Sequence, residues 1–150
     1  MTTWCYWAGP KPPAIELCID SLRRHNPDFE LLDDDDFASR APEISELVAG
    51  RSPQVRADLF RLWLLANHGG QWVDADCVAL RRLDMVDQLS DQVDMVAFSN
   101  GQSGHVSNTI LAANPGSAVA REALDRAVKV VEQHRAGQII PYGATGQGVL

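Results

Sequence analysis

The amino-acid sequence predicts an α/β fold with a mostly parallel central sheet flanked by helices. Two short β-prone segments, "TTWCYW" and "FELL", enclose the apolar-striped segment Ala14–Arg24, which has helical spacing. A β-α-β opening of this kind is typical of α/β layers, because the helix returns the chain to start a parallel strand. With 150 residues, the chain is long enough for one domain with its own core. We therefore expect residues 1–150 to form a single domain.

The middle of the chain is predicted to hold three helices. The acidic run Asp33–Asp36 is interpreted as a solvated turn that leads into a helix, rather than as a metal site. A short helix is expected near Pro42–Val48. A longer helix is predicted from Pro53, because Ser52 is a favourable N-cap and Pro53 suits the first helical position. Gly69 is placed to end this helix in a left-handed conformation.

The second half of the chain is predicted to contain further strands and one more long helix. The segment "QWV" is expected to be a strand, and "CVAL" is expected to resume extended structure after the "DAD" that lies between them. Strands are also predicted at Met95–Phe98 and Thr109–Ala113. An amphipathic helix is predicted from Ser117 to about His134. A glycine-rich tail, "PYGATGQGVL", follows.

Composition and charge narrow the class of protein. Apolar residues make up 45% and charged residues 22%, as in ordinary globular proteins. The net charge of −7 disfavours a nucleic-acid backbone as a partner. The sequence has no apolar run of the roughly 18 residues that a transmembrane segment needs, and its start lacks the pattern of a signal peptide. The three cysteines fit no metal-binding spacing and are expected to be free thiols, which favours the cytoplasm.

Two aspartates, Asp74 and Asp76, follow the predicted strand "QWV". In open α/β sheets, ligands bind where strands end, and side chains two residues apart share one direction if extended geometry continues. Two carboxylates aimed at one point repel each other, and a hard cation such as Mg²⁺ or Mn²⁺ relieves that repulsion. The alternative is a pair of solvated turn aspartates, and the pair alone does not decide between them. His105 and His134 are interpreted as surface histidines rather than further ligands.

The helix that precedes this pair carries Asp58 and Arg61 one turn apart. One interpretation is a surface ion pair, which contributes only about 0.2–0.5 kcal/mol. The other interpretation starts from the double glycine, Gly69 and Gly70, which can turn the chain sharply from the helix into the strand. That turn would bring Asp58 and Arg61 beside the end of the strand.

The block "RADLFRLWLLANHGGQWVDADCVALRRLD" resembles the sugar-binding region with the DXD motif in the family 32 glycosyltransferases. These include capsular polysaccharide synthesis and initiation-specific mannosyltransferase relatives, and the large clostridial glucosylating toxins share the pattern. Weaker resemblances lie in "TTWCYWAGPKPP", "SLRRHNPDFELLDDDDF", "HVSNTILAANPGS" and "TGQGVL". Ala57 stands where the family often has Ser, and Gln147 where it has Pro. The pattern, S-D-x-x-R-x-x-x-L followed by G-G-x-[YW]-x-D-x-D, is matched at Asp58, Arg61, Leu65, Gly69, Gly70, Trp72, Asp74 and Asp76.

This resemblance implies a GT-A fold, a Rossmann-like domain that binds a nucleotide sugar. It implies a metal-dependent glycosyltransferase that moves a hexose from a UDP- or GDP-linked donor to a glycan or another hydroxyl acceptor, with retention, as in polysaccharide biosynthesis. The implied cofactor is Mn²⁺ or Mg²⁺. Asp74 and Asp76 are the implied catalytic and metal-binding pair: Asp76 as a direct ligand, Asp74 also holding ribose or sugar hydroxyls. Asp58 and Arg61 would contact the sugar or phosphate of the donor.

The resemblance also implies donor-binding roles with structural alternatives. Trp4 or Trp7 would stack on the base, against the alternative of core packing. Asn108 would lie near the sugar or acceptor, against the alternative of a strand cap. The glycines Gly69 and Gly70 belong to the same donor-binding region.

Relatives continue well past the T-G motif, so this domain is expected to be short at its C-terminus. We expect an open site whose tail is too short to cover a nucleotide diphosphate, unless a second chain of a homo-oligomer supplies the cover. Two other functions stay open. One is a non-catalytic module that binds sugar nucleotides. The other is a phosphohydrolase of the haloacid-dehalogenase type, because "DADCV" also matches its D-x-D-x-[TV] motif.

Overall fold

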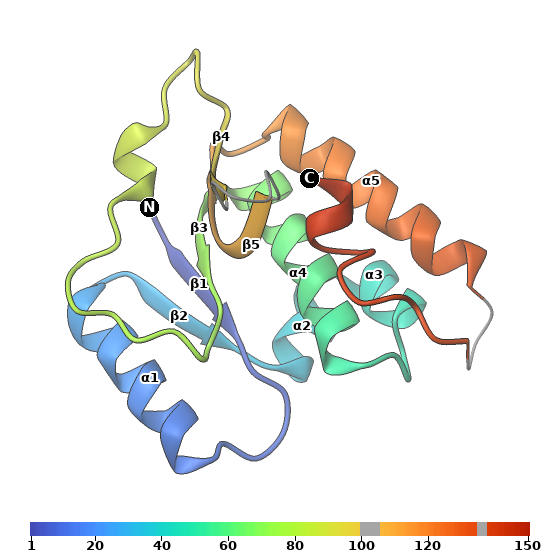
Figure 1. The fold of residues 1–150 in the computed structure, drawn as a ribbon, viewed down its shortest axis with the longest axis horizontal. Coiled ribbons are helices and arrows are strands. Elements are labelled where there is room, and N and C mark those ends of the chain that lie inside the picture. The colour runs from blue at the N-terminus through green and yellow to red at the C-terminus, as the bar shows by residue number, and fades with distance from the viewer. Residues whose placement is uncertain (100–105, 135–137) are drawn as a thin grey trace.

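A computed structural model describes residues 1–99, 106–134 and 138–150 as a five-stranded sheet with helices on both faces (Figure 1). In order, the elements are β1 (Thr3–Tyr6), α1 (Pro13–His25), β2 (Phe29–Leu32), α2 (Asp34–Arg40), α3 (Pro42–Leu47), α4 (Pro53–His68), β3 (Gly70–Val73), the 3-10 turn η1 (Met85–Gln88), β4 (Met95–Ser99), β5 (Val106–Ala113), α5 (Ala118–Gln133) and the 3-10 turn η2 (Gln147–Val149). The predicted α/β class and the predicted helices and strands are confirmed, except for the extended segment "CVAL" that was expected directly after the DXD motif.

The sheet has the strand order β2-β1-β3-β5-β4 and is mixed rather than mostly parallel. β1 pairs in parallel with β2 and with β3, whereas β5 is antiparallel to both β3 and β4. The expected parallel arrangement therefore holds only for the first three strands. Helical crossovers enforce parallel pairing between those strands. Among the described residues, only the 3-10 turn η1 lies between β3 and β4, and no α-helix lies between β3, β4 and β5.

Two hydrophobic clusters lie on opposite faces of the sheet. Helix α1 covers one face, where Ile19 and Leu22 pack with Cys5 of β1 and Val73 of β3. Helices α4 and α5 cover the other face and contribute most of the larger cluster (Figure 1). None of the helices in the described parts of the chain has the length and apolar character needed to cross a membrane.

Helix α4 is buried on nearly all sides, because it lies between the sheet, α3 and α5. Ser52 caps its first turn by accepting a hydrogen bond from the backbone N–H of Val55, at 3.4 Å. Its buried residues include the charged Asp58 and Arg61, which are only 8% and 4% exposed. The interpretation of these two residues as a surface ion pair is therefore wrong.

The acidic run begins α2, as predicted. Asp33 accepts hydrogen bonds from the backbone N–H groups of Asp35 and Asp36, and the Asp36 side chain caps Asp33 in return. Asp34 accepts hydrogen bonds from the Tyr6 hydroxyl and, at 2.6 Å, from Arg56. The run thus connects the end of β1 to the start of α4 and is a structural feature.

The double glycine that joins α4 to β3 is required by space and by backbone conformation. Both residues have positive φ, 64° at Gly69 and 95° at Gly70. A Cβ atom at Gly70 would lie 2.5 Å from the carbonyl oxygen of Thr2, which directly precedes the neighbouring strand β1. The carbonyl of Gly69 accepts a hydrogen bond of 2.8 Å from the indole N–H of Trp4. The glycines therefore allow β3 to lie directly against β1.

Alanine substitution measures this constraint. Gly9 also has positive φ, at 87°, but has open space around it, so Gly9→Ala is a matched control for backbone strain alone. We expect Gly9→Ala to lower the free energy of unfolding by about 1–3 kcal/mol, the usual cost of a sparsely populated backbone conformation. Gly70→Ala should lower the free energy of unfolding by clearly more, because its Cβ atom would also overlap the carbonyl oxygen of Thr2. Equal losses in urea denaturation would contradict the role of the close contact.

Candidate functional site

A cavity of about 600 Å³ lies where β1 and β3 end and α4 begins. Its walls come from the end of β1, the first turns of α4, the DXD segment, Asn108 of β5 and the C-terminal segment. The site residues among them that the sequence predicts are Trp7, Asp58, Arg61, Asp74, Asp76 and Asn108. Because β1 and β3 are parallel, their carboxyl ends meet at this edge, which is the usual place for a ligand in an α/β sheet.

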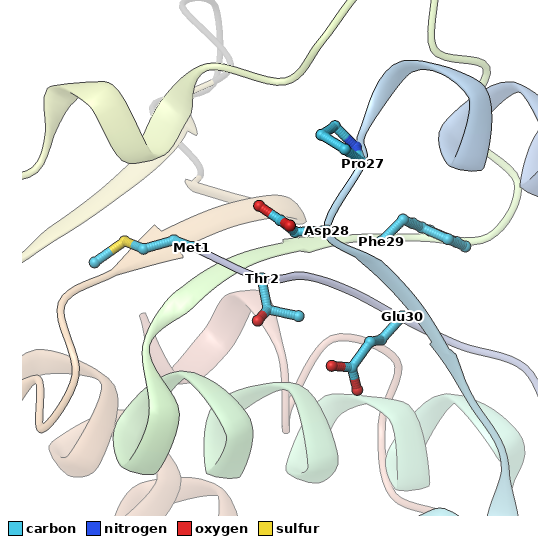
Figure 2. Close-up of a pocket in the computed structure, with 6 residues that line it drawn as sticks. All are labelled: Met1, Thr2, Pro27, Asp28, Phe29 and Glu30. Carbon is cyan, nitrogen blue, oxygen red and sulfur yellow. The ribbon is translucent and has the colours of Figure 1, made fainter.

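A second hollow, of about 500 Å³, lies at the opposite, amino-terminal ends of β1 and β2 (Figure 2). It is lined by Met1, Thr2, Pro27, Asp28, Phe29 and Glu30. Of its two carboxylates, Glu30 is already paired with Arg40 at 3.0 Å. None of the site residues predicted from the sequence lies there, so the chemistry belongs to the first cavity.

The guanidinium of Arg61 occupies the centre of the cavity wall. Its Nη2 atom lies 3.3 Å from Asp58 Oδ1 and 3.1 Å from Asp74 Oδ1, and its Nη1 atom donates to the backbone carbonyl of Asn108. The same group lies over the Trp72 ring, 4.9 Å from the ring centroid. One buried cation therefore joins α4, the end of β3 and β5.

Both carboxylate oxygens of Asp58 accept hydrogen bonds from neighbouring side chains. Oδ1 accepts a hydrogen bond of 3.0 Å from the side-chain amide of Asn108, and Oδ2 accepts one of 2.8 Å from the Thr145 hydroxyl. Burial raises the pKa of Asp58 above its ordinary value, although the charge of Arg61 and the Thr145 hydrogen bond act in the opposite direction. Two carboxylates, those of Asp58 and Asp74, pair with the single guanidinium of Arg61, so the network has one more acidic group than basic groups.

Asp74 is half-buried and bound to two neighbours. It accepts a hydrogen bond of 2.8 Å from the indole N–H of Trp72 and pairs with Arg61. Burial raises its pKa against the effects of Arg61 and Trp72, and the nearby carboxylates of Asp76 and Asp58 raise it further. Asp74 therefore sits in an electrostatic environment that favours an incoming cation.

The DXD segment is a turn, so the predicted extended structure through "CVAL" is wrong. The backbone N–H of Cys77 donates to the carbonyl of Asp74 at 3.1 Å, and no strand follows within the described residues before β4. The turn exposes Asp76, whose carboxylate makes no hydrogen bond or ion pair with the described residues. Both aspartates still line the cavity, although strand alternation is not what places them there.

The donor set suits a hard divalent cation that is shared with a ligand. Asp74 and Asp76 offer carboxylate oxygens, which Mg²⁺ and Mn²⁺ prefer. Within the described ranges, no group of three or more His, Cys, Asp or Glu side chains could hold a metal by itself. A cation at this turn would therefore take its remaining oxygens from water and from a bound phosphate, as is usual for Mg²⁺.

The other predicted donor-binding residues divide into two groups. Trp7 lines the cavity, and its indole N–H donates to the carbonyl of Pro10 at 3.1 Å. Trp4 is 5% exposed and packs in the core beneath the guanidinium of Arg40, which favours the packing alternative. Gly69 and Gly70 shape the turn into β3 and do not line the cavity.

Sequence reasoning did not single out Thr145 as a site residue. The only signal for it is the resemblance of "TGQGVL" to the family's T-G motif, which does not by itself indicate a contact with Asp58. Of the two histidines, His134 ends α5 with Nδ1 at 2.6 Å from the carbonyl of Val130 and does not line the cavity. His105 lies outside the described residues.

The raised pKa of Asp58 predicts a pH-dependent stability. The folded protein holds this proton more tightly than the unfolded chain, so the contribution of Asp58 to stability increases as the pH falls through the folded-state pKa toward 3.8. In urea denaturation between about pH 4 and about pH 7, wild type should gain stability relative to Asp58→Asn as the pH is lowered. A difference in unfolding free energy that stays constant with pH would contradict the raised pKa.

Comparisons with known proteins agree with this geometry. A family model described as "Glycosyltransferase sugar-binding region containing DXD motif" matches residues 12–95, more than half of the chain. No curated protein matches the sequence. Among solved structures, "PaToxG Glycosyltransferase" is similar in fold, with a TM-score of 0.66 at 14% sequence identity. That match covers 99% of this chain but 65% of the other, so this chain spans about two thirds of its length. The chain belongs to the glycosyltransferase family defined by the DXD-containing sugar-binding region.

Proposed function

We propose that this chain forms a single domain with a GT-A fold and is a metal-dependent glycosyltransferase of the family 32 type. It would move a sugar from a UDP- or GDP-linked donor to a glycan or another hydroxyl acceptor, as in polysaccharide biosynthesis. The observation that carries the proposal is the charge of the cavity. Among the described residues, its charged lining consists of three carboxylates and one guanidinium, a formal charge of −2.

A cavity with this charge repels a nucleotide diphosphate unless a cation enters with it. Asp76 is exposed and has no hydrogen-bond partner among the described residues, so it is free to bind such a cation. Asp74 would share the cation through the oxygen that does not face Arg61 and Trp72. When bound, Mn²⁺ or Mg²⁺ would stabilise the negative charge that develops on the leaving diphosphate.

Asp58, Arg61 and Asn108 would recognise the sugar of the donor. A carboxylate has about four acceptor positions, and the protein uses three of those on Asp58. One position is left for a sugar hydroxyl. Trp7, which lines the cavity just after β1, is an aromatic ring that could stack on the base.

Retention of the anomeric configuration rests on the resemblance to the family. The nearby Cys77 is not a convincing nucleophile, because burial and the charges of Asp74 and Asp76 raise the pKa of its thiol to about 11. Asp74 pairs with Arg61 and accepts a hydrogen bond from Trp72, which also argues against its use as the nucleophile of a phosphohydrolase.

We propose a cytoplasmic protein, since Cys5, Cys18 and Cys77 are all free thiols. We also propose a homo-oligomer, in which a second chain would close the site.

Removing the charge of Asp76 tests the metal role. Asp76→Asn keeps the shape of the side chain but weakens it as a ligand for a hard cation. Losing this ligand should weaken Mn²⁺-dependent binding of the nucleotide sugar by about 10- to 100-fold or more. Even mutating a residue that only hydrogen-bonds a metal ligand typically lowers metal affinity by about that factor. Calorimetric titration with UDP- and GDP-sugars in the presence of Mn²⁺ measures this affinity. Asp125→Asn, at an exposed carboxylate of α5, is the matched control and should bind as wild type does. Equal affinity in Asp76→Asn and wild type would rule out this metal site.

The same preparations separate the alternative functions. A transferase releases or transfers the sugar of a nucleotide sugar, whereas a binding module holds the nucleotide with metal and releases nothing. Turnover of p-nitrophenyl phosphate without sugar release would favour a phosphohydrolase.

A further inference from the structure

The C-terminal segment forms one wall of the cavity. Residues 139–143, Thr145 and Gln147 all line it, and this segment runs beside α4 in red in Figure 1. The C-terminal segment is therefore packed against the site rather than directed away from it. Within the segment, Thr145 is 2% exposed, and its hydroxyl donates to Asp58 Oδ2 at 2.8 Å.

Gly146 makes this close approach possible. A Cβ atom there would overlap the side-chain amide of Asn108 and would lie 2.8 Å from Asp58 Oδ1. The backbone around it is closed by hydrogen bonds from the N–H groups of Gly146 and Gly148 to the carbonyl of Gly143, at 3.2 Å and 2.8 Å. A compact turn thus brings Thr145 onto the carboxylate of α4.

The contact fixes the plane of the Asp58 carboxylate. Arg61 and Asn108 hold Oδ1, but Thr145 is the partner of Oδ2 among the described residues. Without the Thr145 hydroxyl, this buried oxygen would have no partner and the carboxylate could turn about its last bond. An unsatisfied buried acceptor is costly, so the hydrogen bond also holds the segment in place.

We propose that Thr145 is a positioning residue, which orients Asp58 toward the sugar of the donor and anchors residues 138–150 as a wall of the cavity. The sugar part of this inference rests on the proposed function, whereas the anchoring is a property of the free protein. Thr145 acts through Asp58 and need not touch the reacting atoms.

Three variants of the whole chain test the proposal. Thr145→Val removes the hydroxyl at nearly constant shape, and Thr145→Ser restores it. Thr3→Val is the matched control, because Thr3 is equally buried, its hydroxyl accepts from Gln71 at 2.9 Å, and it does not line the cavity. If valine prevents folding, Thr145→Ala replaces it with the same expectation.

The first measurement needs no ligand. Amide hydrogen exchange in residues 138–150 should be faster in Thr145→Val by about tenfold or more, as expected for losing a hydrogen bond to a charged group. Thr145→Ser should exchange nearly as wild type does, and Thr3→Val should leave this segment unchanged. Unchanged exchange in Thr145→Val would overturn the anchoring.

The second measurement compares a nucleotide sugar with its nucleotide diphosphate, both with Mn²⁺. Thr145→Val should weaken binding of the nucleotide sugar by about tenfold more than binding of the diphosphate, because Asp58 is proposed to contact the sugar. Thr145→Ser should recover most of the lost affinity. Equal losses for both ligands would overturn the orienting role. If wild type binds neither ligand, the proposed function and the orienting role both fail, while the exchange measurement still decides the anchoring.

Discussion

A single buried guanidinium determines how the site is assembled. Arg61 is 4% exposed, and an unpaired charge at such a depth would cost several kcal/mol. The chain meets this cost with Asp58 from the same helix, Asp74 from the end of β3 and the carbonyl of Asn108 from β5. Three segments distant in sequence must therefore reach their native positions together. The geometry of the sugar-binding region is a consequence of burying this cation.

The ion pairs of Arg61 differ from those elsewhere on the molecule. Arg23 and Asp20 lie 2.9 Å apart but are more than half exposed, so water screens their attraction and they add little to stability. At the cavity, burial keeps the pKa values of Asp58 and Asp74 raised in spite of Arg61. The cavity wall has three carboxylates and one guanidinium, and this balance supports the proposed binding of a diphosphate together with a metal.

Local sequence signals predicted the elements well because caps and breakers act over a few residues. Ser52 and Gly69 mark the ends of α4, and both were identified from sequence alone. Strand direction beyond β3 was not predictable, since no α-helical crossover in the described part of the chain constrains β4 and β5. Residue spacing identified Asp58 and Arg61 as neighbours, but their burial depends on packing by α5 and the sheet. The contact with Thr145 spans 87 residues and has no local signal that could have revealed it.

The most direct test of this account is the stability of Arg61→Met, compared with Arg23→Met in the same urea denaturation experiment. Methionine keeps much of the apolar stem of arginine and removes the charge in both variants. Because Arg61→Met leaves the buried carboxylate of Asp58 and the half-buried one of Asp74 without their cation, it should lose about 3–5 kcal/mol of unfolding free energy. Arg23→Met should lose less than about 1 kcal/mol, as exposed pairs do. Small and equal losses in the two variants would show that the site does not depend on the buried guanidinium.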